Sequence, residues 1–122
     1  MARLVIVDDQ TPLAAVLAQF FSQRGFSVQT AGLEAALSLV RAHQPDVLLL
    51  DPYPGSSGLD GAELLRTLKA LCPKAVIFII SAEIRDEKKA TMLELGAKRY
   101  FEKPLSMREV LQAIHDNLSA EA

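Results

Sequence analysis

Short apolar runs alternate along this chain with stretches in which apolar residues recur every three to four positions. The runs predict strands at residues 3–7, 27–31, 46–50, 75–80 and 98–102. The first, third and fourth runs are almost continuously apolar, which is typical of central strands covered on both faces. The second and fifth runs mix polar with apolar residues, as expected of strands near a sheet edge.

The stretches with helical spacing predict five helices. We expect them between Thr11 and Gly25, from Leu33 to about His43, over residues 61–71, over residues 85–95, and after a capping Ser106. Val16 and Leu37 are assigned to the core faces of the first two. The fourth is rich in charge and has few apolar anchors. Strands alternating with helices indicate parallel strands joined by right-handed crossovers, and therefore an open, doubly wound α/β sheet.

Composition narrows the class of protein. The chain has 122 residues, of which half are hydrophobic, and this suits one domain with a true core. The single cysteine, Cys72, suits a reducing cytoplasm and is expected to pack near a helix end. The net charge is −2 and the sequence has no basic block, so nucleic acid is not favoured as a partner. No apolar run approaches the ~18 residues that a membrane span needs, so a membrane is not favoured either. The chain could be whole or part of a longer protein.

Polar residues follow the predicted strands at the end where such sheets carry their functional groups. Asp8 and Asp9 end the first strand, Asp51 ends the third, Ser81 ends the fourth, and Lys103 follows the fifth. Several carboxylates in one crevice repel each other, and a hard cation relieves that repulsion. Oxygen ligands without nearby Cys or His favour Mg²⁺, or Mn²⁺, over zinc. A lysine and a hydroxyl beside them indicate an anionic ligand, and the whole set indicates phosphoryl transfer onto a carboxylate.

Four fragments in order resemble the receiver domain of two-component response regulators. They are "VIVDDQ" with its acidic pair, "DVLLLD" ending in the phosphoacceptor, "IIS" followed by Ala82, and "GAKRYFEKP" with Tyr100 three residues before Lys103. The resemblance covers the whole chain, so residues 1–122 are expected to form a single receiver domain. It implies a flavodoxin-like sheet with strand order 2-1-3-4-5 and five helices. It also implies a signalling module that catalyses only its own phosphorylation and slow dephosphorylation.

The resemblance further implies a role for each matched residue at the strand ends. Asp51 would accept a phosphoryl group from a partner histidine kinase or phosphotransfer protein. Asp9 would ligate Mg²⁺ directly and Asp8 mainly through water, with Asp51 and the main-chain carbonyl of Tyr53 as further ligands. Lys103 would pair with Asp51 at rest and with the phosphoryl group afterwards.

Signalling would depend on a second group of residues. Ser81 would move toward the phosphoryl group, and Tyr100 would turn inward into the vacated space. The N–H groups of Tyr53 and Ala82 would donate to the phosphoryl oxygens. The face formed by the fourth helix, fifth strand and fifth helix would then bind a downstream effector or output domain. A homodimer through this face is left open.

The loop after Asp51 departs from the family pattern. Pro52 has no N–H to donate to a phosphoryl oxygen, and Asp60 with Gly61 comes two residues late. Tyr53 and Glu83 occupy the positions that border the path of the attacking water in this family. A bulky Tyr and an acidic Glu could shield or repel that water, so slow dephosphorylation is expected.

Three other interpretations compete with the phosphoacceptor receiver. The altered loop allows a degenerate receiver that binds a partner without being phosphorylated, although the set of Asp8, Asp9, Asp51, Ser81 and Lys103 is intact. A Mg²⁺-dependent aspartyl phosphatase would typically carry a second Asp where Tyr53 stands, and it would need a cap that so short a chain lacks. A dinucleotide-binding domain would need a Gly-rich first turn, and "VDDQTP" has none.

Overall fold

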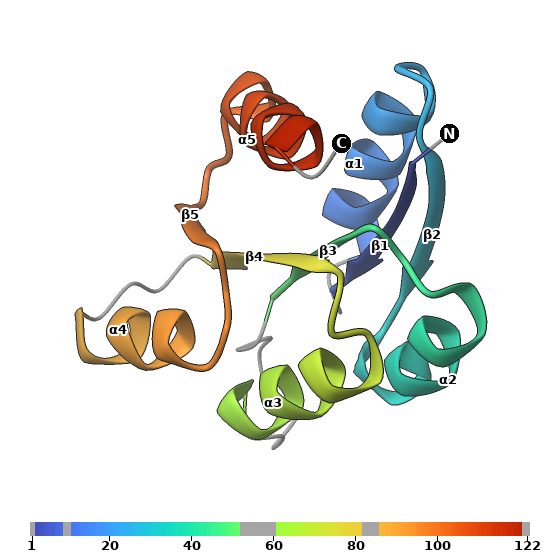
Figure 1. Ribbon diagram of the computed structural model, residues 1–122. Coiled ribbons are helices and arrows are strands. Elements are labelled where there is room, and N and C mark those ends of the chain that lie inside the picture. Colours follow the sequence, from blue (N-terminus) through green and yellow to red (C-terminus); the bar gives the residue numbers. More distant parts are fainter. Residues whose placement is uncertain (1, 9–10, 52–60, 82–85, 121–122) are drawn as a thin grey trace.

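A parallel sheet forms the middle layer of the molecule (Figure 1). The computed structural model describes residues 2–8, 11–51, 61–81 and 86–120. Within them the strands are β1 (Arg3–Val7), β2 (Ser27–Ala31), β3 (Val47–Leu50), β4 (Val76–Ser81) and β5 (Arg99–Glu102). Neighbouring strands pair in parallel in the order β2-β1-β3-β4-β5. The predicted fold class and strand order are therefore confirmed.

Helices cover both faces of the sheet (Figure 1). They are α1 (Thr11–Ser22), α2 (Leu33–His43), α3 (Gly61–Leu71), α4 (Asp86–Glu94) and α5 (Met107–Ala120). α1 and α5 lie on one face, and α2, α3 and α4 lie on the other. Ser106 caps α5 as predicted, because its Oγ accepts a hydrogen bond from the N–H of Glu109 at 3.3 Å. None of the described helices is long and apolar enough to cross a membrane.

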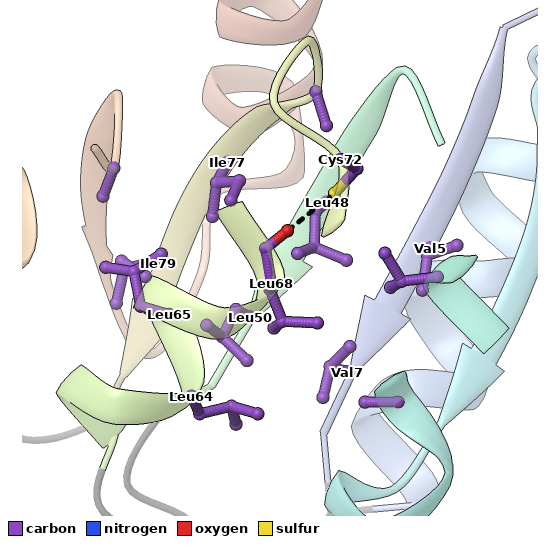
Figure 2. Close-up of a cluster of buried hydrophobic side chains, with 14 of the residues drawn as sticks. Val5, Val7, Leu48, Leu50, Leu64, Leu65, Leu68, Cys72, Ile77 and Ile79 are labelled. Atoms are coloured by element: carbon purple, nitrogen blue, oxygen red, sulfur yellow. Dashed lines mark hydrogen bonds between the residues drawn. The ribbon is translucent and has the colours of Figure 1, made fainter. Parts of the chain in front are cut away.

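Alternating side chains of the central strands build a separate core on each face of the sheet. In β1, Leu4 and Ile6 pack toward α1 and α5, whereas Val5 and Val7 pack toward α2 and α3. The same alternation continues through β3 and β4, whose apolar side chains are all buried. Figure 2 shows the second of these cores, in which leucines of α3 face the side chains of β1, β3 and β4. Burial on both faces explains why these three strands read as continuous apolar runs.

Two apolar residues assigned to core faces are exposed instead. Val16 is 52% exposed and Leu37 is 37% exposed. In α1 the buried positions are Ala14, Leu17 and Phe21, and Val16 points well away from them because each residue turns the helix by about 100°. In α2, Ala36 is buried rather than Leu37. The assignment was wrong because it counted apolar residues without choosing the stripe that meets the sheet.

The fourth helix is weakly anchored, as its composition suggested. Met92 is fully buried in the core beside α3, whereas Leu93 is 40% exposed. Gly96 ends this segment with φ +116°, a left-handed conformation that favours glycine. A helix with few buried apolar side chains has a low cost of local displacement.

Cys72 lies in the core at the end of α3, and its Sγ–H donates to the carbonyl oxygen of Leu68 at 3.1 Å (Figure 2). Burial raises the pKa of the thiol from its ordinary value of 9.0, and the nearby Lys69 ammonium offsets only part of that rise. The folded state therefore holds this proton more tightly than the unfolded state. The contribution of the protonated Cys72 thiol to the stability of the folded state is complete below the pKa of the unfolded state. It is lost in alkaline solution, as the pH rises through the pKa of the folded state.

Native Cys72 is expected to react with a disulfide reagent such as DTNB at pH 8 on the order of a hundredfold more slowly than in urea. Reaction requires the thiolate, and both burial and the raised pKa suppress that form. Absorbance at the thiolate product band measures the rate, and the chain has no other cysteine to interfere. Equal rates in the native and unfolded states would contradict the buried position.

Candidate functional site

The polar residues predicted at the strand ends are held there by backbone hydrogen bonds that continue the sheet. The N–H of Asp8 donates to the carbonyl of Ala31 at 3.0 Å, and the N–H of Asp51 donates to the carbonyl of Val7 at 3.0 Å. The N–H of Lys103 donates to the carbonyl of Ser81 at 2.9 Å. Each side chain therefore projects from backbone that is fixed by the neighbouring strand.

Asp8, Asp51 and Lys103 form a buried charged cluster. The Nζ of Lys103 lies 2.7 Å from Oδ2 of Asp51 and 3.7 Å from Oδ2 of Asp8. The Lys103 side chain is 12% exposed, and the side chains of Asp8 and Asp51 are 0% and 4% exposed. We call these three residues the acidic site. The shorter contact is a charge-assisted hydrogen bond, which is stronger than a neutral one.

The strand order explains how the acidic site comes together. β1 and β3 are neighbours, so Asp8 and Asp51 follow adjacent strands about 4.8 Å apart. Lys103 follows β5, which is separated from β3 by β4. Its four-carbon stem extends past β4 and brings the ammonium to the carboxylates. One ammonium faces two carboxylates, so the formal charge of the cluster is −1 when all three groups are ionised.

Ser81 lies at the same edge of the sheet. It is the last residue of β4, is 2% exposed and pairs in register with Glu102. Apart from Tyr100, Asp8, Asp51 and Ser81 are the only charged or hydroxyl-bearing side chains that are buried in the described part of the chain. All three were singled out from the sequence. Burial of a polar group is costly, so this concentration at one sheet edge marks the site.

Tyr100 lies on β5, the strand that leads to Lys103 of the acidic site. It is 8% exposed and packs in the core that faces α3 and α4, together with Met92 and Ile79. The side chain is thus already buried here. Its predicted function as a switch stays a prediction.

Several predicted site residues lie outside the described residues. They are Asp9, Tyr53, Ala82 and Glu83, together with Pro52 and the rest of the loop to Asp60. The roles expected of these residues stay predictions. One feature of the described site was missed: the Lys103–Pro104 peptide bond is cis. The only sequence signal was the proline itself, because cis bonds occur mainly before proline.

The acidic site provides oxygen ligands suited to a divalent cation. Asp8 and Asp51 follow neighbouring strands and share one ammonium, which leaves a formal negative charge. Within the described residues no group of three or more Asp, Glu, His or Cys side chains is arranged to hold a metal. Magnesium commonly binds through one or two carboxylates and retains several waters. The two carboxylates therefore fit magnesium better than a metal that needs an all-protein cage.

Comparison with known proteins agrees with this arrangement. A family model described as the response regulator receiver domain matches residues 4–115. A receiver domain protein (CheY-like) from Methanospirillum hungatei JF-1 is 25% identical with a TM-score of 0.90, over 98% of this chain and 95% of that one. A response regulator protein from Burkholderia pseudomallei, whose structure contains a phosphorylated aspartic acid and a calcium ion, is 24% identical with a TM-score of 0.86, over 100% and 74% of the two chains.

A longer protein matches as well. NtrX from Brucella abortus is 26% identical with a TM-score of 0.87, over 98% of this chain but only 27% of that one. The family match extends over most of the sequence, and the structural matches extend over nearly all of it. The chain therefore belongs to the response regulator receiver domain family.

Proposed function

We propose that this chain is a phosphoacceptor receiver in which Asp51 takes a phosphoryl group from a partner histidine kinase or phosphotransfer protein. The observation that carries the proposal is the buried Asp51 carboxylate, held at 2.7 Å by Lys103 and flanked by Asp8. A structural ion pair would need only one carboxylate. A second buried carboxylate beside it destabilises the fold and is explained if the site must bind a cation and a phosphoryl group.

In this reaction an Asp51 oxygen attacks the phosphorus of a phosphohistidine. The P–O bond forms, the P–N bond breaks, and the imidazole leaves and takes up a proton from water. The product is an acyl phosphate on Asp51. Lys103 first holds Asp51 and then pairs with the added phosphoryl oxygens, so its ammonium offsets negative charge in both states.

Asp8 and Asp51 would hold Mg²⁺ in the described part of the site, with Asp9 and the carbonyl of Tyr53 as the other proposed ligands. When bound, the cation neutralises charge on the transferring phosphoryl group. The calcium ion in the Burkholderia pseudomallei structure shows that a receiver-like fold can be found with a divalent cation. The phosphorylated aspartic acid in the same structure supports the type of product proposed here.

The signal would pass from the acidic site to the α4-β5-α5 face. Ser81 is positioned at the end of β4, with β3 and Asp51 on one side and β5 on the other. A shift of Ser81 toward a phosphoryl group, with the N–H of Ala82 as a donor, would alter the surroundings of Tyr100 on β5. The weak anchoring of α4 would let this face change at low cost. The partner that reads it would be an effector protein or an output domain, and Tyr53 and Glu83 would slow the return.

The wild-type protein is expected to gain one phosphoryl group when incubated with acetyl phosphate and Mg²⁺, and to gain none when the metal is removed with EDTA. Without the cation, the phosphoryl donor must approach two buried carboxylates that only one ammonium offsets. Intact-mass spectrometry measures the gain. No gain with Mg²⁺, even with phosphorylated cognate kinase as donor, would instead support a degenerate receiver that binds its partner without phosphorylation.

A further inference from the structure

A cavity lies at the opposite end of the sheet from the acidic site. Its volume is about 320 Å³, and Val76 and Ile77 at the start of β4 form part of its wall. β4 has six residues and ends at Ser81, so the cavity and the acidic site are separated by ~17 Å along the strand. The proposed phosphoryl chemistry does not use this end of the sheet.

Three lysines from different parts of the chain line this cavity. Lys69 belongs to α3, Lys74 to the connection between α3 and β4, and Lys98 directly precedes β5. We call them the basal lysines. No carboxylate stands among the described residues that line the cavity. None of the basal lysines forms an ion pair within the described part of the chain.

One of the basal lysines is already held in place. The Nζ of Lys69 donates to the carbonyl oxygen of Ala75 at 3.1 Å, and this uses one of its three N–H groups. Its methylene chain lies along Gly96, where an added Cβ would come within 3.4 Å of two of its carbons. The missing side chain at Gly96 therefore leaves room for Lys69. A fixed cation loses less entropy on binding a ligand than a mobile one.

We propose that the basal lysines bind a compact multivalent oxyanion of the phosphate class, either as the free ion or as a phosphate ester. Three positive charges around one cavity, with no carboxylate among its described lining residues, attract an anion, and lysine is a common phosphate ligand. The volume equals that of about ten waters, which is room for a pyrophosphate-sized ion with some solvent. A lysine near the carboxyl end of a helix interacts favourably with the helix dipole, which would explain the position of Lys69 in α3. The same interaction does not explain Lys74 or Lys98, because both lie outside the helices.

Titration of the metal-free protein with sodium pyrophosphate is expected to shift the amide resonances of Lys74, Ala75 and Lys98 in ¹H–¹⁵N NMR spectra. Replacing Lys74 and Lys98 by Gln together should weaken binding by about tenfold or more, because two charge-assisted contacts are lost. Both lysines are exposed, so the double variant should remain folded. Binding should also weaken as NaCl is added.

Lys89→Gln is the matched control, since Lys89 is an exposed lysine of α4 that does not line the cavity. Titration with ribose 5-phosphate separates the two sources of the ligand: tighter binding than pyrophosphate indicates an ester, and weaker binding indicates the free ion. The proposal is overturned if pyrophosphate leaves these resonances unchanged, if the double variant binds as the wild type does, or if only resonances around Lys103 respond. Binding of a hexaglutamate peptide without binding of pyrophosphate would also overturn it.

Discussion

Asp51→Asn is expected to remove all phosphoryl gain from acetyl phosphate and Mg²⁺, the largest functional effect that we expect of a single substitution here. An amide is a poor nucleophile and carries no charge for Mg²⁺, so both requirements of the reaction fail together. The fold should survive, because Asp8 and Lys103 would remain as one carboxylate and one ammonium at the site. Intact-mass spectrometry measures the gain, and circular dichroism with urea unfolding checks the fold.

Asp46→Asn is the matched control. Asp46 immediately precedes β3 at its other end, is exposed, and accepts the N–H of Arg3 through Oδ2 at 2.8 Å. An asparagine can still accept that hydrogen bond, so this variant should be phosphorylated like the wild type. A full phosphoryl gain in Asp51→Asn, or its loss in Asp46→Asn, would contradict the assignment of Asp51 as the acceptor.

Lys103→Met is expected to lower the free energy of unfolding by about 3 kcal/mol in metal-free buffer, the largest stability effect that we expect at the acidic site. The substitution leaves Asp8 and Asp51 buried on neighbouring strands without the ammonium that lies 2.7 Å from Asp51. Two uncompensated carboxylates repel each other and are poorly solvated there. Urea unfolding with EDTA present measures the difference.

Three comparisons identify the cause of that loss. Adding Mg²⁺ should stabilise Lys103→Met through binding to the folded state, since the carboxylates that bind the cation are retained. Combining Lys103→Met with Asp51→Asn should destabilise the protein less than the sum of the two single effects, because one of the repelling carboxylates is gone. Lys89→Met, on the exposed face of α4, should change stability by less than about 0.5 kcal/mol. Equal losses in Lys89→Met and Lys103→Met would contradict the electrostatic account.

Anion binding by the basal lysines would give this domain a second anion-binding region, in addition to the acidic site where a phosphoryl group is proposed to bind. Lys98 and Gly96 lie between α4 and β5, and Lys69 lies on α3. An anion bound there would connect α3 to the segment that leads into β5. The two sites lie at opposite ends of β4, so substitutions in one can be tested without altering ligands of the other.

Much of the fold was predictable because its signals are local. Continuous apolar runs identified β1, β3 and β4, and the mixed runs identified the edge strands β2 and β5. Helix ends were marked by residues such as Ser106 and Gly96, whose backbone preferences do not depend on distant contacts. The exposed Val16 and Leu37 were misplaced because their surroundings are set by how each helix rotates against the sheet.

The sequence by itself determined which polar residues stand at the strand ends, since an apolar run that stops at a carboxylate or a hydroxyl is visible without a structure. Asp8, Asp51 and Ser81 were found in this way, and they are buried where polar groups are otherwise excluded. The resemblance implied that Lys103 pairs with Asp51, but only the tertiary structure showed that its side chain extends past β4 to do so at 2.7 Å, and that Lys69, Lys74 and Lys98 line one cavity. The reason is physical: periodicity records the neighbours of a residue within its own element, whereas strand pairing and helix packing bring together residues far apart in the chain.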